Sequence, residues 1–296
     1  IFDANSTDED TGDTLTYTVA GADAGLVNID SSTGVVSLKS SANFETKTSY
    51  SFNVLASDGN SSATQAVIVS VTNENEAPTV TSSTAGTVSE NEATSTVIYT
   101  AAASDVDASD TITYSVSGTD GSLLNIDTST GDVTLKTSAD YETKSSYSFD
   151  LVATDAAGLT DTETVTVSVS DVNDAPTAAA LSSVFLSDAN TLTINESYLN
   201  SVINDVDAGD TLKITNVSIA NSGIGSAAET STGSGSWVYT PSSVSSNTDV
   251  VLNYTVSDAA GSTDTSTLTI TVVDAIPLAN AVNEESSAVQ LAVPSG

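Results

Sequence analysis

The chain contains no cysteine, histidine, methionine or arginine among its 296 residues. Without cysteine it has neither disulfides nor thiolate metal ligands, and the redox state of its compartment cannot be read from cysteine usage. Without histidine and methionine as well, the usual ligands of zinc, copper and haem iron are missing. A metal bound by this chain must therefore be coordinated through oxygen, which suits the hard cations calcium and magnesium.

Positive charge is also scarce, because 39 Asp and Glu residues stand against five lysines and the net charge is −34. This excess of negative charge disfavours nucleic acid or an anionic membrane as a partner and favours cations. The 39% of hydrophobic residues and their regular spacing argue for packed structure rather than disorder. The sequence has no apolar run long enough to predict a membrane span. It also lacks a start methionine and a signal peptide, which indicates processed protein or an internal fragment.

Three segments occur twice with the same offset of 97 positions, as from Asp13 to Asp110. Such self-similarity indicates that one structural unit was copied. The repeated segments are DTLTYTV from Asp13 and DTITYSV from Asp110, NIDSSTG from Asn28 and NIDTSTG from Asn125, and FETKTSYSF from Phe44 and YETKSSYSF from Tyr141.

Short stretches rich in β-branched residues recur between Gly, Asp, Asn and Ser, for example LTYTV from Leu15 and QAVIVSV from Gln65. This spacing predicts about seven short strands per repeat and no long helices. We therefore expect an all-β fold of tandem antiparallel Greek-key β-sandwiches, arranged as an elongated rod.

Acidic stretches followed by proline mark the expected boundaries, at VTNENEAPTV around Pro78 and VSDVNDAPTA around Pro176. The expected domains are repeat 1 over 1–77, without an opening strand, repeat 2 over 78–175, a divergent repeat 3 over 176–275, and a final segment over 276–296. The NAVNEESSAVQLAVPSG stretch from Asn280 looks like an opening strand. It would either begin a further repeat or complete the first module of a neighbouring chain.

Acidic and amide residues recur at matching positions near the ends of the repeats. Residues two apart on an extended segment point the same way, so each DxD pair would present two carboxylates to one ion. Clustered carboxylates repel one another, and a divalent ion reverses that repulsion. The predicted ligands are the DxD pairs Asp8 and Asp10, Asp105 and Asp107, Asp205 and Asp207; the strand-end residues Asp58, Asp155 and Asp258; the linker residues Asn73, Asn75, Glu76, Asp171, Asn173 and Asp174; and Glu45, Asp140, Glu142, Glu90 and its expected counterpart Glu196.

Taken together, these motifs resemble the cadherin repeat, whose calcium sites combine an early Glu, a DxE segment, a DxNDx linker, and DxD plus a later Asp of the following repeat. DVNDAP at 171–176 and DYE at 140–142 match this pattern. The first linker reads NENEA, where Asn73 and Glu76 replace two aspartates, and repeat 3 has no DxE, so that Asp249 or Asp274 would have to substitute. The resemblance covers both junctions and nearly all of repeats 1 and 2, and repeat 3 looks like the divergent cadherin-like modules of bacterial surface proteins. It implies several Ca²⁺ ions bound at the module junctions.

Acidic residues recur at every module boundary, which is more typical of ligands to structural ions than of one catalytic carboxylate pair. We therefore expect that the chain is not an enzyme. We favour a calcium-rigidified extracellular spacer or adhesion segment of a large bacterial surface adhesin of the repeats-in-toxin type. Its partners would be neighbouring repeats, like chains, or host-surface and matrix glycans. One alternative is a subunit of a self-assembling extracellular filament joined by strand complementation. Another is a carbohydrate-binding cadherin-like module, with Trp237 as the candidate residue.

Overall fold

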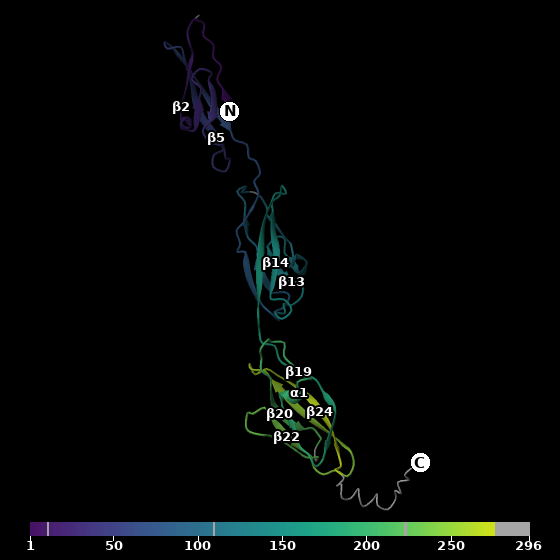
Figure 1. Ribbon diagram of the computed structural model, residues 1–296. Helices are drawn as coiled ribbons and strands as arrows, with labels where there is room; N and C mark the ends of the chain where they lie inside the picture. The colour runs from purple at the N-terminus through teal and green to yellow at the C-terminus, as the bar shows by residue number, and fades with distance from the viewer. Residues whose placement is uncertain (11, 109, 222–223, 276–296) are drawn as a thin grey trace, which may run out of the picture. The chain divides into compact units, whose positions relative to one another are not determined.

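The structure is a computed structural model that describes residues 1–10, 12–108, 110–221 and 224–275 (Figure 1). These residues form two compact units, one of residues 1–139 and 144–170 and the other of residues 140–143 and those from 171 onward. The first unit holds two modules, which we define as β1 to β6 and β7 to β15, and the second unit holds the third module, β16 to β24. The linkers between the modules cover residues 71–78 and 171–176, and the predicted segment 276–296 lies outside the described residues.

The first module consists of two facing three-stranded sheets, with a 3-10 turn between two of the strands. One sheet has the order β1-β4-β3 and the other β2-β5-β6, with every pairing antiparallel. The elements are β1 (Phe2–Asp3), β2 (Thr16–Ala20), η1 (Ala24–Leu26), β3 (Val27–Ile29), β4 (Val35–Leu38), β5 (Ser49–Ser57) and β6 (Ser62–Ser70).

The second module repeats this plan. It adds one strand, β8, beside β15, at the edge that corresponds to β6 of the first module. Its sheets have the orders β11-β14-β15-β8, β12-β13-β9 and β10-β7, and β8 runs parallel to β15. The elements are β7 (Thr79–Val80), β8 (Ala85–Ser89), β9 (Val97–Thr100), β10 (Ala103–Ser104), β11 (Thr113–Ser117), η2 (Gly121–Leu123), β12 (Leu124–Ile126), β13 (Asp132–Leu135), β14 (Ser146–Thr154) and β15 (Thr160–Ser170).

The third module has the same sheet arrangement and adds a short helix. Its sheets have the orders β17-β24-β23-β20, β18-β22-β21 and β16-β19, and β17 runs parallel to β24. The elements are β16 (Thr177–Ala178), β17 (Leu181–Ser187), β18 (Leu192–Ile194), α1 (Glu196–Leu199), β19 (Ile203–Asn204), β20 (Lys213–Ile219), β21 (Ser226–Glu229), β22 (Trp237–Thr240), β23 (Thr248–Ser257) and β24 (Thr263–Val273).

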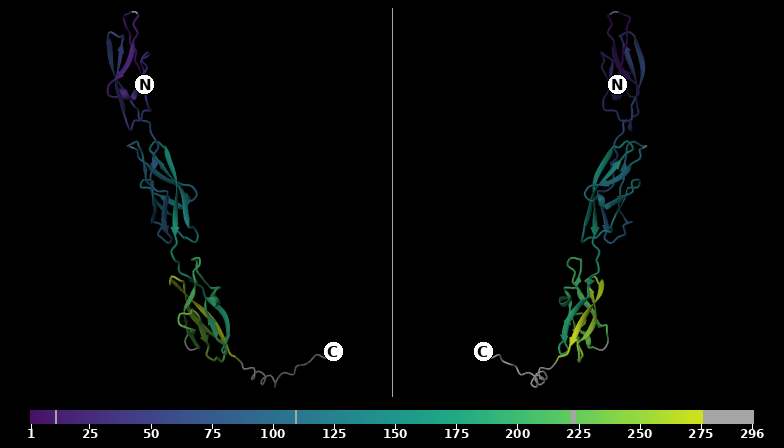
Figure 2. Two further views of the ribbon diagram at one scale, coloured as in Figure 1. Left: turned by 60° about the vertical axis from the view of Figure 1, so that its left-hand side comes forward. Right: turned by 90° about the vertical axis from the view of Figure 1, so that its right-hand side faces the viewer.

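Each module has its own hydrophobic core between the two layers of strands that Figures 1 and 2 show. Side chains alternate between the faces of a strand, so Tyr147, Phe149 and Leu151 of β14 all point inward and are at most 5% exposed. Fully burying a side chain such as Phe149 stabilises the fold by roughly 1.5 to 3 kcal/mol. These alternating strands confirm the prediction of an all-β fold of tandem β-sandwiches.

The repeated NIDSSTG and NIDTSTG segments form tight turns. Oδ1 of Asp30 accepts hydrogen bonds from the Ser32 hydroxyl at 2.6 Å, the Ser32 amide at 2.9 Å and the Thr33 amide at 3.0 Å. Gly34 follows with a φ of +74°, and a Cβ there would lie 2.6 Å from the carbonyl oxygen of Ala4. The hydrogen bonds lower the pKa of Asp30 to about 2. The repeated Asp, Ser, Thr and Gly residues of this segment therefore stabilise the turn.

Four of the five lysines are tied to the loops around η1 and η2. Lys39 and Lys136 donate to carbonyl oxygens of Gly25 and Ser122. The other two form ion pairs, Lys47 with Asp23 at 2.8 Å and Lys144 with Asp120 at 3.0 Å, and each lies over a tyrosine ring. The lysines of the FETK and YETK segments thus have a structural role. None of the helices among the described residues has the length and apolarity needed to cross a bilayer.

Candidate metal sites

The Asp105–Asp110 loop follows β10 and brings its carboxylates toward the end of β14. Oδ1 of Asp105 accepts a hydrogen bond from the amide of Asp107 at 2.9 Å, and the amide of Asp110 donates to the carbonyl oxygen of Asp107 at 3.0 Å. Asp155 follows β14 and accepts from the amides of Gly158 and Leu159. One carboxylate oxygen each of Asp105, Asp110 and Asp155 lies within 4.8 Å of the others.

The corresponding loops of the other modules have the same turn. Amides of Asp10 and Asp207 donate to Oδ1 of Asp8 and Asp205 at 2.8 and 3.0 Å. The prediction that each DxD pair lies on an extended segment is therefore wrong, because the first aspartate closes a turn on the amide two residues later. The turn still gathers carboxylates, as three from one loop lie within 4.8 Å of each other in the sets Asp8, Asp10, Asp13 and Asp205, Asp207, Asp210.

Several of these carboxylate oxygens are buried without a hydrogen-bond partner among the described residues. They are Oδ2 of Asp105, Asp110, Asp205 and Asp210. Burial, together with neighbouring carboxylates, raises the pKa of Asp110 and of Asp205. Leaving a buried polar atom unsatisfied is unfavourable, and a bound cation would satisfy it. The donor set consists of hard oxygen ligands and fits calcium.

Asp13, Asp110 and Asp210 were not among the predicted ligands. The signal for them is visible in the sequence, since DEDTGD, DVDASD and DVDAGD carry a third aspartate at the same place. The sequence pattern does not predict the turn that brings this third aspartate close to the first.

The first linker contacts the loop and strand end of the second module. The side-chain amide of Asn73 donates to Oδ1 of Asp107 at 2.7 Å, and that of Asn75 donates to Oδ2 of Asp155 at 2.7 Å. The backbone amide of Glu76 donates to Oδ2 of Asp107 at 3.0 Å. The hydrogen bond from Asn73, followed by that from Glu76, lowers the pKa of Asp107.

A second group of carboxylates meets where the first linker joins the two modules. Oxygens of Glu45, Glu76 and Asp107 come within 4.8 Å of one another, so the group joins a first-module residue, a linker residue and a second-module residue. Desolvation, followed by the negative charges of Glu45 and Asp107, raises the pKa of Glu76. Beside Glu45, the side-chain oxygen of Asn43 accepts from the amide of Thr46 at 2.7 Å.

The second linker makes two of these three contacts with the third module. The amide side chain of Asn173 donates to Oδ2 of Asp258 at 2.8 Å, and the backbone amide of Asp174 donates to Oδ2 of Asp207 at 2.8 Å. Asp258 also accepts from the amides of Gly261 and Ser262. These bonds, with that from Asn173 the strongest contributor, lower the pKa of Asp258.

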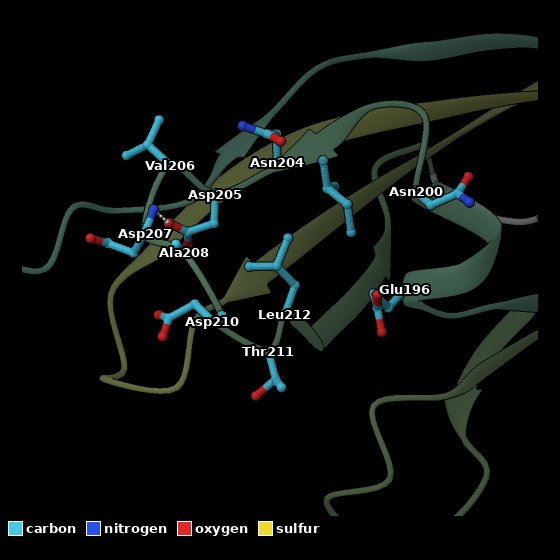
Figure 3. Close-up of a pocket in the computed structure, with 12 residues that line it drawn as sticks. Glu196, Asn200, Asn204, Asp205, Val206, Asp207, Ala208, Asp210, Thr211 and Leu212 are labelled. Atoms are coloured by element: carbon cyan, nitrogen blue, oxygen red, sulfur yellow. Dashed lines mark hydrogen bonds between the residues drawn. The ribbon is translucent and has the colours of Figure 1, made fainter. Parts of the chain in front are cut away.

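The third-module loop borders a concavity of about 420 Å³ (Figure 3). Asp205, Asp207 and Asp210 lie on one side of it, and Glu196 at the start of α1 lies on the other. In the first module, Asp8 and Asp58 line one concavity, and Asp58 accepts from the amides of Asn60 and Ser61. Asp8, Asp10 and Asp13 are all exposed.

Glu196 does not take the place of Glu90, so the predicted correspondence is wrong. Glu90 follows β8 and donates its amide to the carbonyl of Ser170, and in the third module Asp188 follows β17 and donates to Val273 in the same way. Glu196 instead opens α1, whose N-cap Asn195 accepts from the amide of Tyr198 at 2.9 Å. The INES segment is a helix start, and Asp188 is the structural counterpart of Glu90.

The remaining predicted residues are placed as follows. Glu90 is 3% exposed. Asp140 is exposed and accepts from the amide and hydroxyl of Thr143, as Asn43 accepts from Thr46. Glu142 and Asp171 are exposed and belong to the second unit.

Trp237, the candidate for sugar stacking, is half-buried in the third module. Its indole nitrogen donates to the carbonyl oxygen of Ile214 at 3.3 Å, and the ring packs against the core. In this position the Trp237 side chain contributes to the packing of the third module.

Two family models match successive parts of the chain. Residues 84–170 match the Cadherin domain and residues 173–271 match the Bacterial Ig domain. The chain is thus similar to a cadherin domain over residues 84–170 and to a bacterial Ig domain over residues 173–271, and neither description names an enzyme. The third repeat, expected to be a divergent cadherin-like module, is the part that matches the Ig model.

Several curated relatives are long proteins with cadherin or protocadherin names. Rat cadherin-23 is 33% identical over 186 residues, which is 59% of this chain and 6% of cadherin-23. Human protocadherin Fat 1 is 32% identical over 182 residues, 57% of this chain and 4% of that protein. The chain therefore spans only a small part of the relatives it matches.

Solved structures show the same fold. Mouse cadherin-23 EC22-24 aligns with a TM-score of 0.65 and 24% identity, covering 90% of this chain and 89% of that chain. Human CDH23 EC21-23 aligns with a TM-score of 0.58 and 18% identity, covering 88% and 89%. These alignments agree with tandem β-sandwich modules.

Proposed function

We propose that this chain is a calcium-rigidified extracellular spacer or adhesion segment of a large bacterial surface adhesin. The observation that carries the proposal is the paired linker contact, Asn75 with Asp155 and Asn173 with Asp258. The first contact ties the linker to Asp155, which belongs to a carboxylate cluster of the following module, and at the second linker the amide of Asp174 contacts the cluster residue Asp207. An ion bound there would hold linker and module together.

Calcium suits these clusters for electrostatic reasons. It takes about 6 to 8 oxygen ligands, and extracellular modules bind it with a Kd of roughly 10⁻⁴ to 10⁻³ M. A linker asparagine has an amide oxygen beside the nitrogen that now donates, so a turn of that amide would offer the oxygen to an ion. Binding free energy would then stabilise the ordered linker.

The bacterial and adhesive context is supported by composition and resemblance. The last module matches the Bacterial Ig domain, and the chain is acidic and without cysteine. The named cadherin relatives are much longer than this chain, which fits a segment of a large repetitive protein.

Small-angle X-ray scattering of the chain in millimolar calcium and in excess chelator tests the proposal. We expect a long, stiff particle with calcium and a flexible one without it. Asp132→Asn serves as a control, because Asp132 lies outside the clusters and accepts from the Thr100 hydroxyl. If the scattering profile of the unaltered chain is the same with calcium and with chelator, the proposal is contradicted.

A second candidate is a subunit of a strand-complemented filament. Among the described residues no strand lies beside the outer edge of β6, whereas β15 and β24 pair there with β8 and β17. An open edge of this kind accepts a strand from another chain. Sedimentation velocity over a concentration series tests it, and a monomer at every concentration, with or without a peptide of residues 280–296, would exclude it.

A further inference from the structure

We propose that Asp161 and Asp264 are positioning residues that hold the entry strand of their module in place without calcium. The entry strand is the two-residue strand that follows a linker, β7 in the second module and β16 in the third. Each carboxylate accepts a hydrogen bond from a backbone amide of that strand, and we call this contact the entry latch. The latch itself needs no ion, and only its consequence for bending rests on the calcium binding proposed above.

In the second module, β7 pairs with β10 through Thr79 and Val80. Successive amides of a strand point to opposite edges. The amide of Thr81 donates to the carbonyl oxygen of Ala102 at 2.8 Å, on the side of β10. The amide of Val80 faces the other way and donates to Oδ2 of Asp161 on β15 at 2.8 Å. The carboxylate thus takes the place of a neighbouring strand for an amide at the edge of β7.

The third module has the same latch. Its entry strand β16 pairs with β19, and the amide of Ala179 donates to the carbonyl oxygen of Val202 at 2.7 Å. The amide of Ala178 donates to Oδ2 of Asp264 on β24 at 2.8 Å. Both latch aspartates stand in a Thr-Asp-Thr segment that begins the last strand of the module, although the two modules match different family models. Two divergent modules therefore hold their entry strands in the same way.

Both oxygens of each latch carboxylate accept from backbone amides. Oδ1 of Asp161 accepts from the amide of Thr162 at 2.9 Å, and Oδ1 of Asp264 accepts from the amide of Thr265 at 2.7 Å. This short-range bond orients the carboxylate so that Oδ2 faces the entry strand. Neither aspartate belongs to the carboxylate groups described above, which separates the latch from the candidate metal sites.

The latch limits where the chain can bend. Pro78 and Pro176 are buried two residues before the latched amides, and proline fixes its own φ. The side-chain bonds of Asn73 and Asn75, in contrast, go to aspartates of the candidate metal sites. Removal of calcium leaves those aspartates to repel one another, whereas the latch is unaffected. Bending without calcium should therefore occur N-terminal to the two prolines, with each entry strand still in place.

Amide hydrogen exchange, measured by NMR on the full 296-residue chain in excess chelator, tests the latch. In Asp161→Ala the Val80 amide should exchange faster by roughly tenfold or more, because exchange follows the free energy of local opening. Asp161→Asn keeps a side-chain oxygen that accepts, so the Val80 amide should stay protected. Glu163→Ala, at an exposed acidic position on the same strand, is the matched control and should leave Val80 unchanged. Asp264→Ala and Asp264→Asn should affect Ala178 in the same way.

Unchanged exchange of Val80 in Asp161→Ala would overturn the latch. If the amide of Phe149 in the core exchanged faster by the same factor, the change would be global and the assignment would be wrong. Loss of calcium affinity in calorimetry of Asp161→Asn would make Asp161 an ion ligand and would also overturn the inference. If the unaltered chain bound no calcium, the proposed function would fail, while the exchange data in chelator would still decide the latch.

Discussion

Asn75 and Asp155 are 80 residues apart in the sequence, yet the side-chain amide of Asn75 donates to Oδ2 of Asp155 over 2.7 Å. Asn173 and Asp258 repeat the contact at 2.8 Å. These two bonds link each linker to the ionisation of a strand-end aspartate, because they lower the pKa of Asp155 and of Asp258.

Replacing Asn75 with Ala should weaken calcium binding at the first linker by roughly tenfold, or about 1.4 kcal/mol, since it removes the amide oxygen that would turn toward the ion. The chain should also become more flexible at that linker in limiting calcium. Calorimetry and small-angle scattering measure the two effects. Asn125→Ala, an exposed position on β12, is the control and should match the unaltered chain. Equal affinities in both variants would contradict the role assigned to Asn75.

Asp174→Asn should weaken calcium binding at the second linker and increase bending there. The backbone amide of residue 174 would keep its bond to Asp207, so the substitution changes charge more than linker geometry. Calorimetry compares this variant with Asp132→Asn. Unchanged binding in Asp174→Asn would remove this residue from the ligand set.

Acid should destabilise the calcium-free second module in the range where Asp127 becomes protonated. The Ser129 and Thr130 bonds lower the pKa of Asp127 from 3.8 to about 2, so its contribution is present above pH 3.8 and is lost as pH falls toward 2. In Asp127→Asn the urea midpoint should be lower at pH 5 and should fall less between pH 4 and pH 2. A pH dependence identical to that of the unaltered chain would refute this explanation.

Phe149→Ala should destabilise the second module by about 3 to 5 kcal/mol, because the ring is 1% exposed and its loss leaves a cavity. Phe185→Ala is the matched exposed substitution, at 70% exposure, and should change stability by no more than about 0.5 kcal/mol. Urea unfolding in chelator, followed with a probe for each module, measures both. A small effect of Phe149→Ala would mean that the core adjusts around the gap.

The sequence predicted the strands well where side chains alternate, as in β5 and β14, because inward positions there are nearly all apolar. Its assignment of Asp105, Asp107 and Asp155 as metal ligands stays a prediction. It misplaced Glu196, since a short INES segment reads equally well as an acidic strand end or as a helix start. It missed Asp110, because burial of that carboxylate depends on a turn and on packing that the local pattern does not specify.

The contacts of four lysines with their own loops affect how closely copies of the chain can pack side by side. With Lys39, Lys47, Lys136 and Lys144 held against their own loops, little positive charge is available to meet the carboxylates of an adjacent molecule. Many copies anchored side by side would behave as a polyelectrolyte brush, in which lateral repulsion acts over a Debye length of about 8 Å in physiological salt. Calcium would then have two effects at once, ordering each chain along its length and allowing neighbouring chains to stand closer together.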